Sequence, residues 1–147
     1  MSDGLQQLLD ERDAGRVVID LFLATDRRDW VQVEACLAPR LTLDMTGTPI
    51  DTTGAAVAAM WKDGLAAIDH VHHQVGNLVV EVRGDEADAS CYGIALHHRK
   101  IAGPQRTRVF VGSYRIHLAR LDRRWRIDQF TFELAFLEGN LELEKAT

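Results

Sequence analysis

The sequence predicts an α+β domain in which three N-terminal helices pack on one face of a strongly curved antiparallel sheet. Apolar residues recur at three- and four-residue steps up to Ile68, which is typical of helices, and long β-branched segments follow from His70 onward. With 147 residues, of which 46% are hydrophobic, the chain can bury one core and still enclose a cavity. We therefore expect a single domain spanning residues 1–147.

The helical half divides at its capping and breaking residues. Three helices are predicted, over residues 3–26, 30–37 and 53–68. Gly15 lies in the middle of the first helix and predicts a break or kink there. Asp29 is expected to cap the second helix, and Pro39 to end it.

The second half predicts a meander of long strands after one short strand. The short strand is expected at 41–45, and the long strands at 71–82, 87–99, 106–120 and 125–136, separated by turns. Glycines at 76, 93 and 112 fall inside predicted strands, where glycine often marks a bulge or bend. The polar tail 138–147 is expected to fray.

The charge balance excludes one class of partner. Lys and Arg total 17 against 22 Asp and Glu, for a net charge of −5, so the chain lacks the cationic surplus that binds nucleic acid. Basic clusters at 99–108 and 123–126 fall at predicted hairpin ends and are interpreted as solvated turns. No signal peptide or membrane span is predicted, and Cys36 and Cys91 match no metal or redox spacing. A reduced, cytoplasmic location without membrane contact is expected.

Asp26 and His73 form the most informative pair for chemistry. Asp26 falls at the predicted end of the first helix, where the helix dipole disfavours a carboxylate. Helix stability alone would favour Lys or Arg at this position. His73 opens the first long strand, and a histidine held by a carboxylate is a common general base. The structural alternatives are an Asp26 that faces solvent or pairs with Arg27 or Arg28, and a polar sheet end for the histidines.

Other residues are candidates for the wall of a pocket, and their spacing does not predict a metal site. His97 and His98 alternate on their strand, so at most one faces the interior. A metal site drawn from Asp26, His73 and His97 lacks any recognised spacing, so neither a metal nor another cofactor is expected. Large apolar side chains are candidates for the wall, with plain core packing as the alternative; they are Trp30, Met45, Trp61, Tyr92, Phe110, Phe130 and Phe132.

Several segments, in order, carry a resemblance to a known family. They are Asp26-Arg-Arg-Asp29-Trp30, Leu37-Ala-Pro39, Leu41-Thr-Leu-Asp44, His73-Gln-Val-Gly76-Asn77, Val82-Arg-Gly-Asp-Glu-Ala87 and Leu121-Asp-Arg-Arg-Trp125-Arg-Ile127. Together they resemble the NTF2-like superfamily, and within it the SnoaL-like branch that includes scytalone dehydratase and polyketide cyclases. The resemblance implies a cone with a deep pocket, dimerisation through the sheet, and an Asp–His dyad at the positions of Asp26 and His73.

The same resemblance shows departures from the dehydratase. Tyrosines of that enzyme correspond to Thr25 and Met45 here, and its second histidine falls near Val109 or Val111. The tyrosine pair that would polarise a substrate carbonyl is therefore missing, and dehydration of scytalone itself is not expected.

The resulting hypothesis is a cofactor-independent lyase or isomerase, of dehydratase, cyclase or isomerase type. His73 would abstract a proton next to a carbonyl while Asp26 holds the ring. The expected pocket is hydrophobic, and Thr25, Trp30, Met45, Trp61, His97, Val109 and Phe130 are predicted to contact an aromatic or polycyclic small molecule. The alternatives are a non-catalytic protein that binds such a ligand, and the small subunit of an oxygenase. A homodimer formed through the sheet is expected.

Overall fold

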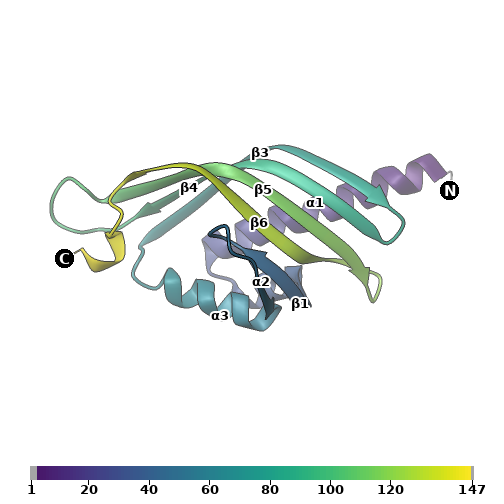
Figure 1. Cartoon of the computed structure of the whole chain (residues 1–147), viewed down its shortest axis with the longest axis horizontal. Helices are drawn as coiled ribbons and strands as arrows, with labels where there is room; N and C mark the ends of the chain where they lie inside the picture. Colours follow the sequence, from purple (N-terminus) through teal and green to yellow (C-terminus); the bar gives the residue numbers. More distant parts are fainter. Residues whose placement is uncertain (1–2, 147) are drawn as a thin grey trace.

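Three α-helices, six strands and a short C-terminal 3₁₀ helix are found in the computed structural model, which describes residues 3–146 (Figure 1). The helices are α1 (Asp3–Arg27), α2 (Trp30–Cys36), α3 (Gly54–Gly64) and the 3₁₀ helix η1 (Leu143–Lys145). The strands are β1 (Leu37–Asp44), β2 (Ile50–Thr53), β3 (His70–Arg83), β4 (Glu86–His98), β5 (Thr107–Leu121) and β6 (Arg124–Gly139).

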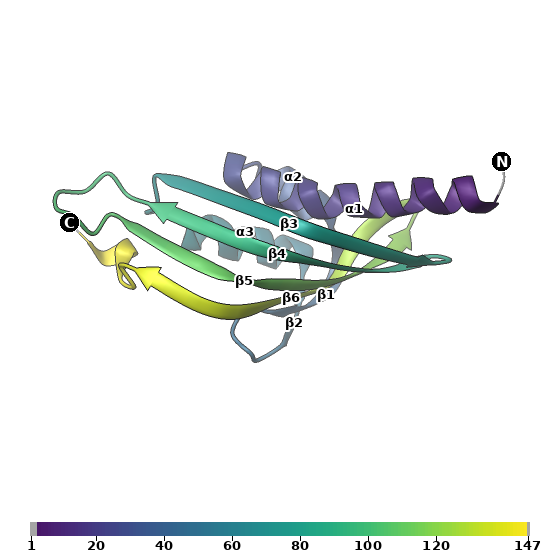
Figure 2. The same cartoon turned by 90° about the horizontal axis from the view of Figure 1, so that it is seen from above.

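The strands form one mixed sheet in the order β2-β1-β6-β5-β4-β3. β1 and β6 pair in parallel, whereas the other neighbours pair antiparallel. Figures 1 and 2 show the α-helices on the hollow side of this sheet. The predicted α+β fold, with helices on one face and a meander of four long strands, is confirmed. The sheet is mixed rather than antiparallel throughout, because β1 and β6 pair in parallel.

The long strands bend, so that the sheet arches over α2 and α3 (Figure 1). The pairing register shifts between Gly76 and Val79 on β3, and between Val111 and Gly112 on β5. Such irregularities bend a strand and increase its local twist. Gly112 also permits a close approach of β6, because a Cβ atom there would lie 2.3 Å from the carbonyl oxygen of Glu133.

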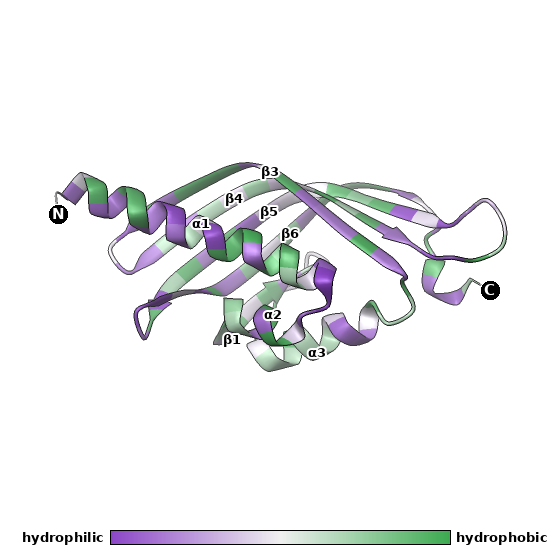
Figure 3. Cartoon of the chain, turned by 180° about the vertical axis from the view of Figure 1, so that it is seen from behind, coloured by the Kyte–Doolittle hydropathy of each residue, from purple (hydrophilic) through white to green (hydrophobic). Residues whose placement is uncertain are grey.

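α1 is continuous from Asp3 to Arg27, so the predicted break at Gly15 does not occur. Gly15 is buried, and a Cβ atom there would lie 3.3 Å from Cγ2 of Val80. Its missing side chain lets α1 lie close against β3, and this packing offsets the low helix propensity of glycine. Hydrophilic and hydrophobic positions alternate along α1 (Figure 3). Within residues 3–146, no helix has the length and apolar content that a bilayer crossing requires.

The end of α1 is a left-handed turn that fixes the position of Asp26. Arg28 has a φ angle of 59°. Its N–H donates to the Thr25 carbonyl at 3.1 Å, and the Asp29 N–H donates to the Ala24 carbonyl at 2.9 Å. This pair of bonds is the Schellman arrangement, which satisfies the last carbonyls of a helix. Asp29 then caps α2 as predicted, since its side chain accepts a backbone N–H at 3.1 Å.

The secondary structure departs from the predicted one mainly around β1, β2 and the end of α3. β1 begins at Leu37, before Pro39, because its pairing with β6 is irregular between Leu37 and Thr42 and demands no ladder bond from the proline. β2 was not expected, and it pairs with β1 as a short edge strand. α3 ends at Gly64 rather than at Ile68.

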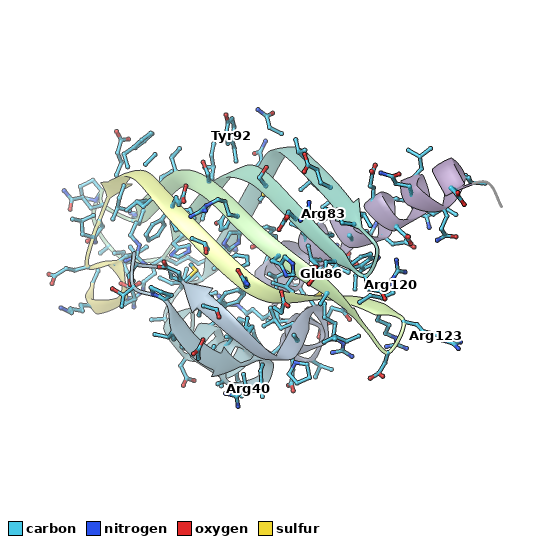
Figure 4. The ribbon with its side chains drawn as sticks, turned by 45° about the vertical axis from the view of Figure 1, so that its right-hand side comes forward. Arg40, Arg83, Glu86, Tyr92, Arg120 and Arg123 are labelled. Carbon is cyan, nitrogen blue, oxygen red and sulfur yellow. The ribbon has the colours of Figure 1, made fainter. Side chains whose placement is uncertain are left out.

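The two faces of the sheet differ in character. The inner face of β4 carries small buried side chains, namely Ala87, Ala89, Cys91 and Ala95. On the outer face an apolar row crosses three strands, because Ile94 pairs with Val111 and Val111 pairs with Phe136. Ile94 is 41% exposed and Phe136 51% exposed. Tyr92 also belongs to the outer face and points away from the sheet (Figure 4).

The tail is held in place up to Ala146, so the prediction that it frays is wrong for the described residues. Leu143 is fully buried, and Arg99 donates to the carbonyls of Leu143, Glu144 and Ala146 at 2.6–3.0 Å. Arg108, interpreted from the sequence as part of a solvated turn, is only 8% exposed and pairs with Glu144. The tail is ordered because one apolar side chain anchors it and two arginines bind its polar groups.

Candidate functional site

A mainly apolar cavity of about 330 Å³ lies between the hollow face of the sheet and the ends of α1 and α3. Its lining comes from two helices, the connections after α3 and β1, and the four long strands; it comprises Phe22, Thr25, Met45, Met60, Trp61, Gly64, Leu65, His73, His97, Tyr114 and Phe130. The volume is at the small end of the range for ligand pockets. Its polar groups are concentrated on His73, His97 and Tyr114, which all come from the sheet.

The structure brings Asp26 and His73 into direct contact. Oδ1 of Asp26 lies 2.6 Å from Nδ1 of His73, and Oδ2 accepts the backbone N–H of His73 at 2.9 Å. Both side chains are largely buried, at 17% and 14% exposed respectively. An ionised carboxylate accepts only, so the His73 Nδ1 carries a proton and Nε2 is left as the acceptor in the neutral ring. This is the tautomer that a general base at Nε2 requires.

Arg28 fixes the helix end that carries Asp26. Its guanidinium donates to the carbonyl of Leu65 at 2.9 Å and also to the carbonyl of Ile68. These carbonyls belong to the connection between α3 and β3, so Arg28 joins the end of α1 to the start of the strand that carries His73. The sequence raised Arg28 as a possible partner of Asp26, whereas the structure gives it this bridging role.

His97 lies on the cavity wall in contact with Arg108. Nδ1 of His97 is 3.1 Å from an Nη atom of Arg108, and its ring centroid is 5.2 Å from that of Phe110. Burial lowers the pKa of His97 to about 4, and the positive charge of Arg108 acts in the same direction. His97 is therefore a neutral imidazole at pH 7.

Tyr114 is a cavity residue that the sequence did not single out. Its ring packs edge-on to Phe22 at 4.8 Å between centroids and lies 4.9 Å from Phe132. Burial raises the pKa of the Tyr114 hydroxyl, so this group stays protonated and can donate a hydrogen bond. Gly93 makes room for the ring, because a Cβ atom there would lie 2.2 Å from Cε2 of Tyr114. Gly93 pairs with Gly112, so Tyr114 is its diagonal neighbour, and two strand glycines close to a tyrosine were the available signal.

Five of the seven predicted contact residues line the cavity together, namely Thr25, Met45, Trp61, His97 and Phe130. Trp61 and Phe130 meet edge-to-face at 5.8 Å between centroids. The Thr25 hydroxyl donates to the Leu21 carbonyl at 2.8 Å, so its proton is already used within α1.

Two predicted contact residues, Trp30 and Val109, do not line the cavity and require correction. Trp30 starts α2 and packs against the core. Val109 occupies the alternate position between Arg108 and Phe110, the two residues that contact His97, and its side chain is therefore on the opposite face of β5. Tyr92, a further candidate for the wall, is likewise on the outer face and is 63% exposed.

A second Asp–His pair lies on the outer face of the sheet. Nδ1 of His117 is 2.5 Å from Oδ1 of Asp128, and these side chains are 21% and 29% exposed. The adjacent hollow is lined by charged side chains such as Glu81, Asp88 and Arg115, in contrast to the apolar wall around His73. Across residues 3–146, no three His, Cys, Asp or Glu side chains group closely enough to hold a metal ion.

Comparison with known proteins gives the family context. A family profile described as SnoaL-like domain matches residues 6–131. No curated protein matches the sequence significantly.

Three solved structures illustrate the similarity of fold. Kfla4162 of Kribbella flavida is similar with a TM-score of 0.85 and 19% identity, over 95% of this chain and 99% of that one. A Novosphingobium aromaticivorans protein, provisionally assigned as a scytalone dehydratase, gives a TM-score of 0.78 and 16% identity over 90% and 89%. The hexachlorocyclohexane dehydrochlorinase LinA-type3 of Novosphingobium barchaimii gives a TM-score of 0.79 and 15% identity, over 95% of this chain and 96% of that one. At these identities the likeness shows the shared fold.

Proposed function

The chain belongs to the SnoaL-like domain family, and on that premise we propose that it is a cofactor-independent lyase or isomerase that abstracts a proton next to a carbonyl. The observation that carries the proposal is the buried contact of 2.6 Å between Asp26 and His73 at the wall of an apolar cavity. A carboxylate that orients an imidazole and offsets its developing charge is the usual arrangement of a histidine base.

The proposed reaction begins with transfer of a carbon-bound proton to Nε2 of His73. The ring becomes an imidazolium, whose charge Asp26 stabilises through the Nδ1–H hydrogen bond. The electron pair left on carbon moves to the carbonyl oxygen and gives an enolate. In a dehydration, the enolate electrons form a carbon–carbon double bond while the hydroxyl group on the next carbon takes the proton from His73 and departs as water. In another elimination, the leaving group departs as an anion and His73 releases its proton to solvent. In an isomerisation, His73 returns the proton to a different carbon.

The enolate oxygen requires a hydrogen-bond donor, and the strands that line the cavity offer two candidates. Tyr114 and His97 both line the cavity and are both neutral at pH 7. They would take the place of the tyrosines that the dehydratase has at the positions of Thr25 and Met45. Two of the structural neighbours are named for a dehydration and a dehydrochlorination, which supports an elimination among the possible outcomes.

The proposed substrate is a small hydrophobic molecule with a carbonyl group. The cavity volume of about 330 Å³ suits one or two fused rings, and Trp61 and Phe130 present aromatic surface to them. Thermal-shift screening with planar ketones, phenols and steroids supplies ligands for turnover assays.

The decisive test replaces His73 by Gln. We expect turnover to fall by about 10²–10⁴, the usual contribution of general-base catalysis, with an unchanged circular dichroism spectrum. His72→Gln is the matched control, because His72 is the neighbouring residue on β3 and is exposed. Full activity of the His73 variant would refute the proposal.

A non-catalytic binding protein is the second candidate. The observation in its favour is that the positions of the two dehydratase tyrosines hold Thr25, whose hydroxyl is bonded within α1, and Met45, which has no proton to donate. It predicts that ligands found by screening bind to the wild type without conversion, and that His73→Gln changes their affinity alone.

We also propose that two copies associate through the outer face of the sheet. The row formed by Ile94, Val111 and Phe136 crosses three neighbouring strands and leaves apolar surface exposed. Contiguous apolar surface of this kind is characteristic of a protein interface.

A further inference from the structure

The two cavity histidines have opposite hydrogen-bonding environments. Nδ1 of His73 faces a carboxylate, which only accepts hydrogen bonds. Nδ1 of His97 faces an Nη atom of Arg108 at 3.1 Å, and a guanidinium only donates hydrogen bonds. In a neutral ring, Nδ1 of His97 is therefore the acceptor, and the proton is on Nε2.

Arg108 is held in place from several directions. It forms an ion pair with Glu144, donates to the Leu141 carbonyl at 3.3 Å, and lies 5.1 Å from the ring centroid of Phe110. Its side chain is only 9% exposed. A buried guanidinium is costly unless its charge is paired, so the position of Arg108 depends on Glu144.

Glu144 belongs to η1, a segment with its own fixed position. Leu143 is fully buried, and Arg99 donates to three carbonyls of this segment. A chain of contacts thus runs from the C-terminal segment through Glu144 and Arg108 to the cavity wall at His97. Arg108 contacts Nδ1 of His97, and no group among residues 3–146 hydrogen-bonds to Nε2. The Nε2 nitrogen is therefore free for a ligand in the cavity.

We propose that Arg108, held by Glu144, is a positioning residue that fixes the Nε2–H tautomer of His97, so that His97 donates a hydrogen bond to the substrate oxygen while His73 acts as the base. η1 is thereby a functional part of the site. This assignment rests on the proposed function for its catalytic meaning. It also specifies the substrate, which presents an uncharged oxygen acceptor to His97 on β4 and an acidic C–H bond to His73 on β3.

The charge balance of the site agrees with an uncharged substrate. The pair with Glu144 neutralises Arg108, and the His97 imidazole is neutral at pH 7. The carboxylate of Asp26, bonded to His73, lies beside the cavity and disfavours an anionic substrate.

Nitrogen NMR tests the tautomer directly and without substrate. In long-range ¹H–¹⁵N spectra of the histidine-labelled wild type at pH 7, assigned with His97→Gln, we expect His97 to carry its proton on Nε2. Arg108→Met removes the donor but keeps an apolar stem, and it should convert His97 to a mixture of tautomers. Glu142→Gln is the control, because it breaks an exposed pair with Lys145 on the same segment and should leave the His97 signals unchanged.

Several outcomes would overturn the assignment. They are a wild-type His97 with its proton on Nδ1 or on both nitrogens at pH 7, or an Arg108→Met spectrum with the tautomer unchanged. Should Arg108→Met fail to fold, Glu144→Gln gives a smaller change in the same direction, and no change in that variant counts against the proposal.

Kinetics separate this inference from the proposed function. Arg108→Met should lower kcat with little change in KM, by less than the roughly 10²–10³ that loss of a direct oxyanion donor costs, and Arg108→Lys should restore part of the loss. Retained activity in His73→Gln would refute the proposed function while leaving the tautomer measurement intact. A fixed Nε2–H tautomer with unchanged kcat in Arg108→Met would refute the role of Arg108 alone.

Discussion

Asp26 contacts His73 at two points, one on the ring and one on the backbone of β3. Its Oδ1 lies 2.6 Å from Nδ1, and its Oδ2 accepts the backbone N–H at 2.9 Å. One carboxylate therefore orients the imidazole and also fixes the strand that carries it. The last turn of α1 is unfavourable for a negative charge, and these two bonds offset that cost.

Asp26→Asn is predicted to lower kcat by about 10²–10⁴. An amide presents one oxygen and one NH₂ group, so it cannot accept both hydrogen bonds, and with NH₂ toward the ring it favours the wrong tautomer of His73. Steady-state kinetics on a substrate found by screening measures the effect. Asp29→Asn is the matched control, because asparagine caps a helix as well as aspartate does. Equal losses in both variants would contradict a specific role for Asp26.

Gly93→Ala is predicted to destabilise the fold by about 1–3 kcal/mol, the usual cost of overpacking a core. The new Cβ atom would lie 2.2 Å from Cε2 of Tyr114, whose ring is fixed by Phe22 and Phe132. Displacement of this ring should also weaken ligand binding in the cavity. Urea unfolding and a ligand titration measure the two effects.

Gly76→Ala is the control for that change. Gly76 is a strand glycine on β3, and a Cβ atom there would meet nothing within 4 Å. We expect its free energy of unfolding to stay within about 0.5 kcal/mol of the wild type, as for most surface substitutions. A loss in Gly76→Ala as large as that in Gly93→Ala would contradict the role of the contact with Tyr114, because the lower backbone entropy of alanine in the unfolded chain by itself favours folding.

The sequence predicts the elements of this fold because local patterns determine most of them. Apolar spacing identified three helices, and Asp29 marked the start of α2. Gly15 led to the wrong prediction of a break, because glycine has a low helix propensity. Its close packing against β3, which offsets that cost, is a tertiary contact that the local sequence does not show. Leu143 misled the prediction in the same way, since the two leucines of the polar tail give no periodic signal and the burial of Leu143 depends on distant partners.

The candidate site is predictable only in part. Asp26 was noticed because its position conflicts with the helix dipole. Its pairing with His73 was inferred from the chemistry of the two residues, and the family resemblance supported it. The roles of Arg108 and Tyr114 depend on which residues face each other across β4 and β5. Val109 was misplaced for that reason, because a shift of one residue moves a side chain to the opposite face of the sheet.

Stability is predicted to fall between pH 6.5 and about 4 because of His97. Burial, followed by the charge of Arg108, lowers the pKa of His97 from 6.5 to about 4 in the folded protein. In this window the unfolded chain binds a proton at His97 that the folded chain does not, so the free energy of unfolding decreases as the pH decreases. At about 1.4 kcal/mol per pKa unit, the loss has an upper limit of about 3 kcal/mol.

Urea unfolding of the wild type and His97→Gln at several pH values isolates this contribution. The difference in stability between the two proteins should shrink as the pH falls from 6.5 to 4 and stay constant above pH 7. His70→Gln is the control, because His70 is exposed at the start of β3. A difference between wild type and His97→Gln that is independent of pH would show that His97 titrates normally in the folded state.

Ile94→Glu is predicted to convert the proposed dimer into a monomer. Ile94 begins the apolar row that continues through Val111 to Phe136 on the outer face, and a buried unpaired carboxylate there would cost several kcal/mol of association free energy. Light scattering after gel filtration should give the wild type twice the chain mass of 16.5 kDa and the variant that mass once. Val31→Glu is the matched control, since Val31 is 83% exposed on α2 and away from the sheet's outer face. A monomeric wild type at tens of micromolar would contradict the proposed interface, because exposed apolar surface on three adjacent strands would then have no partner among copies of this chain.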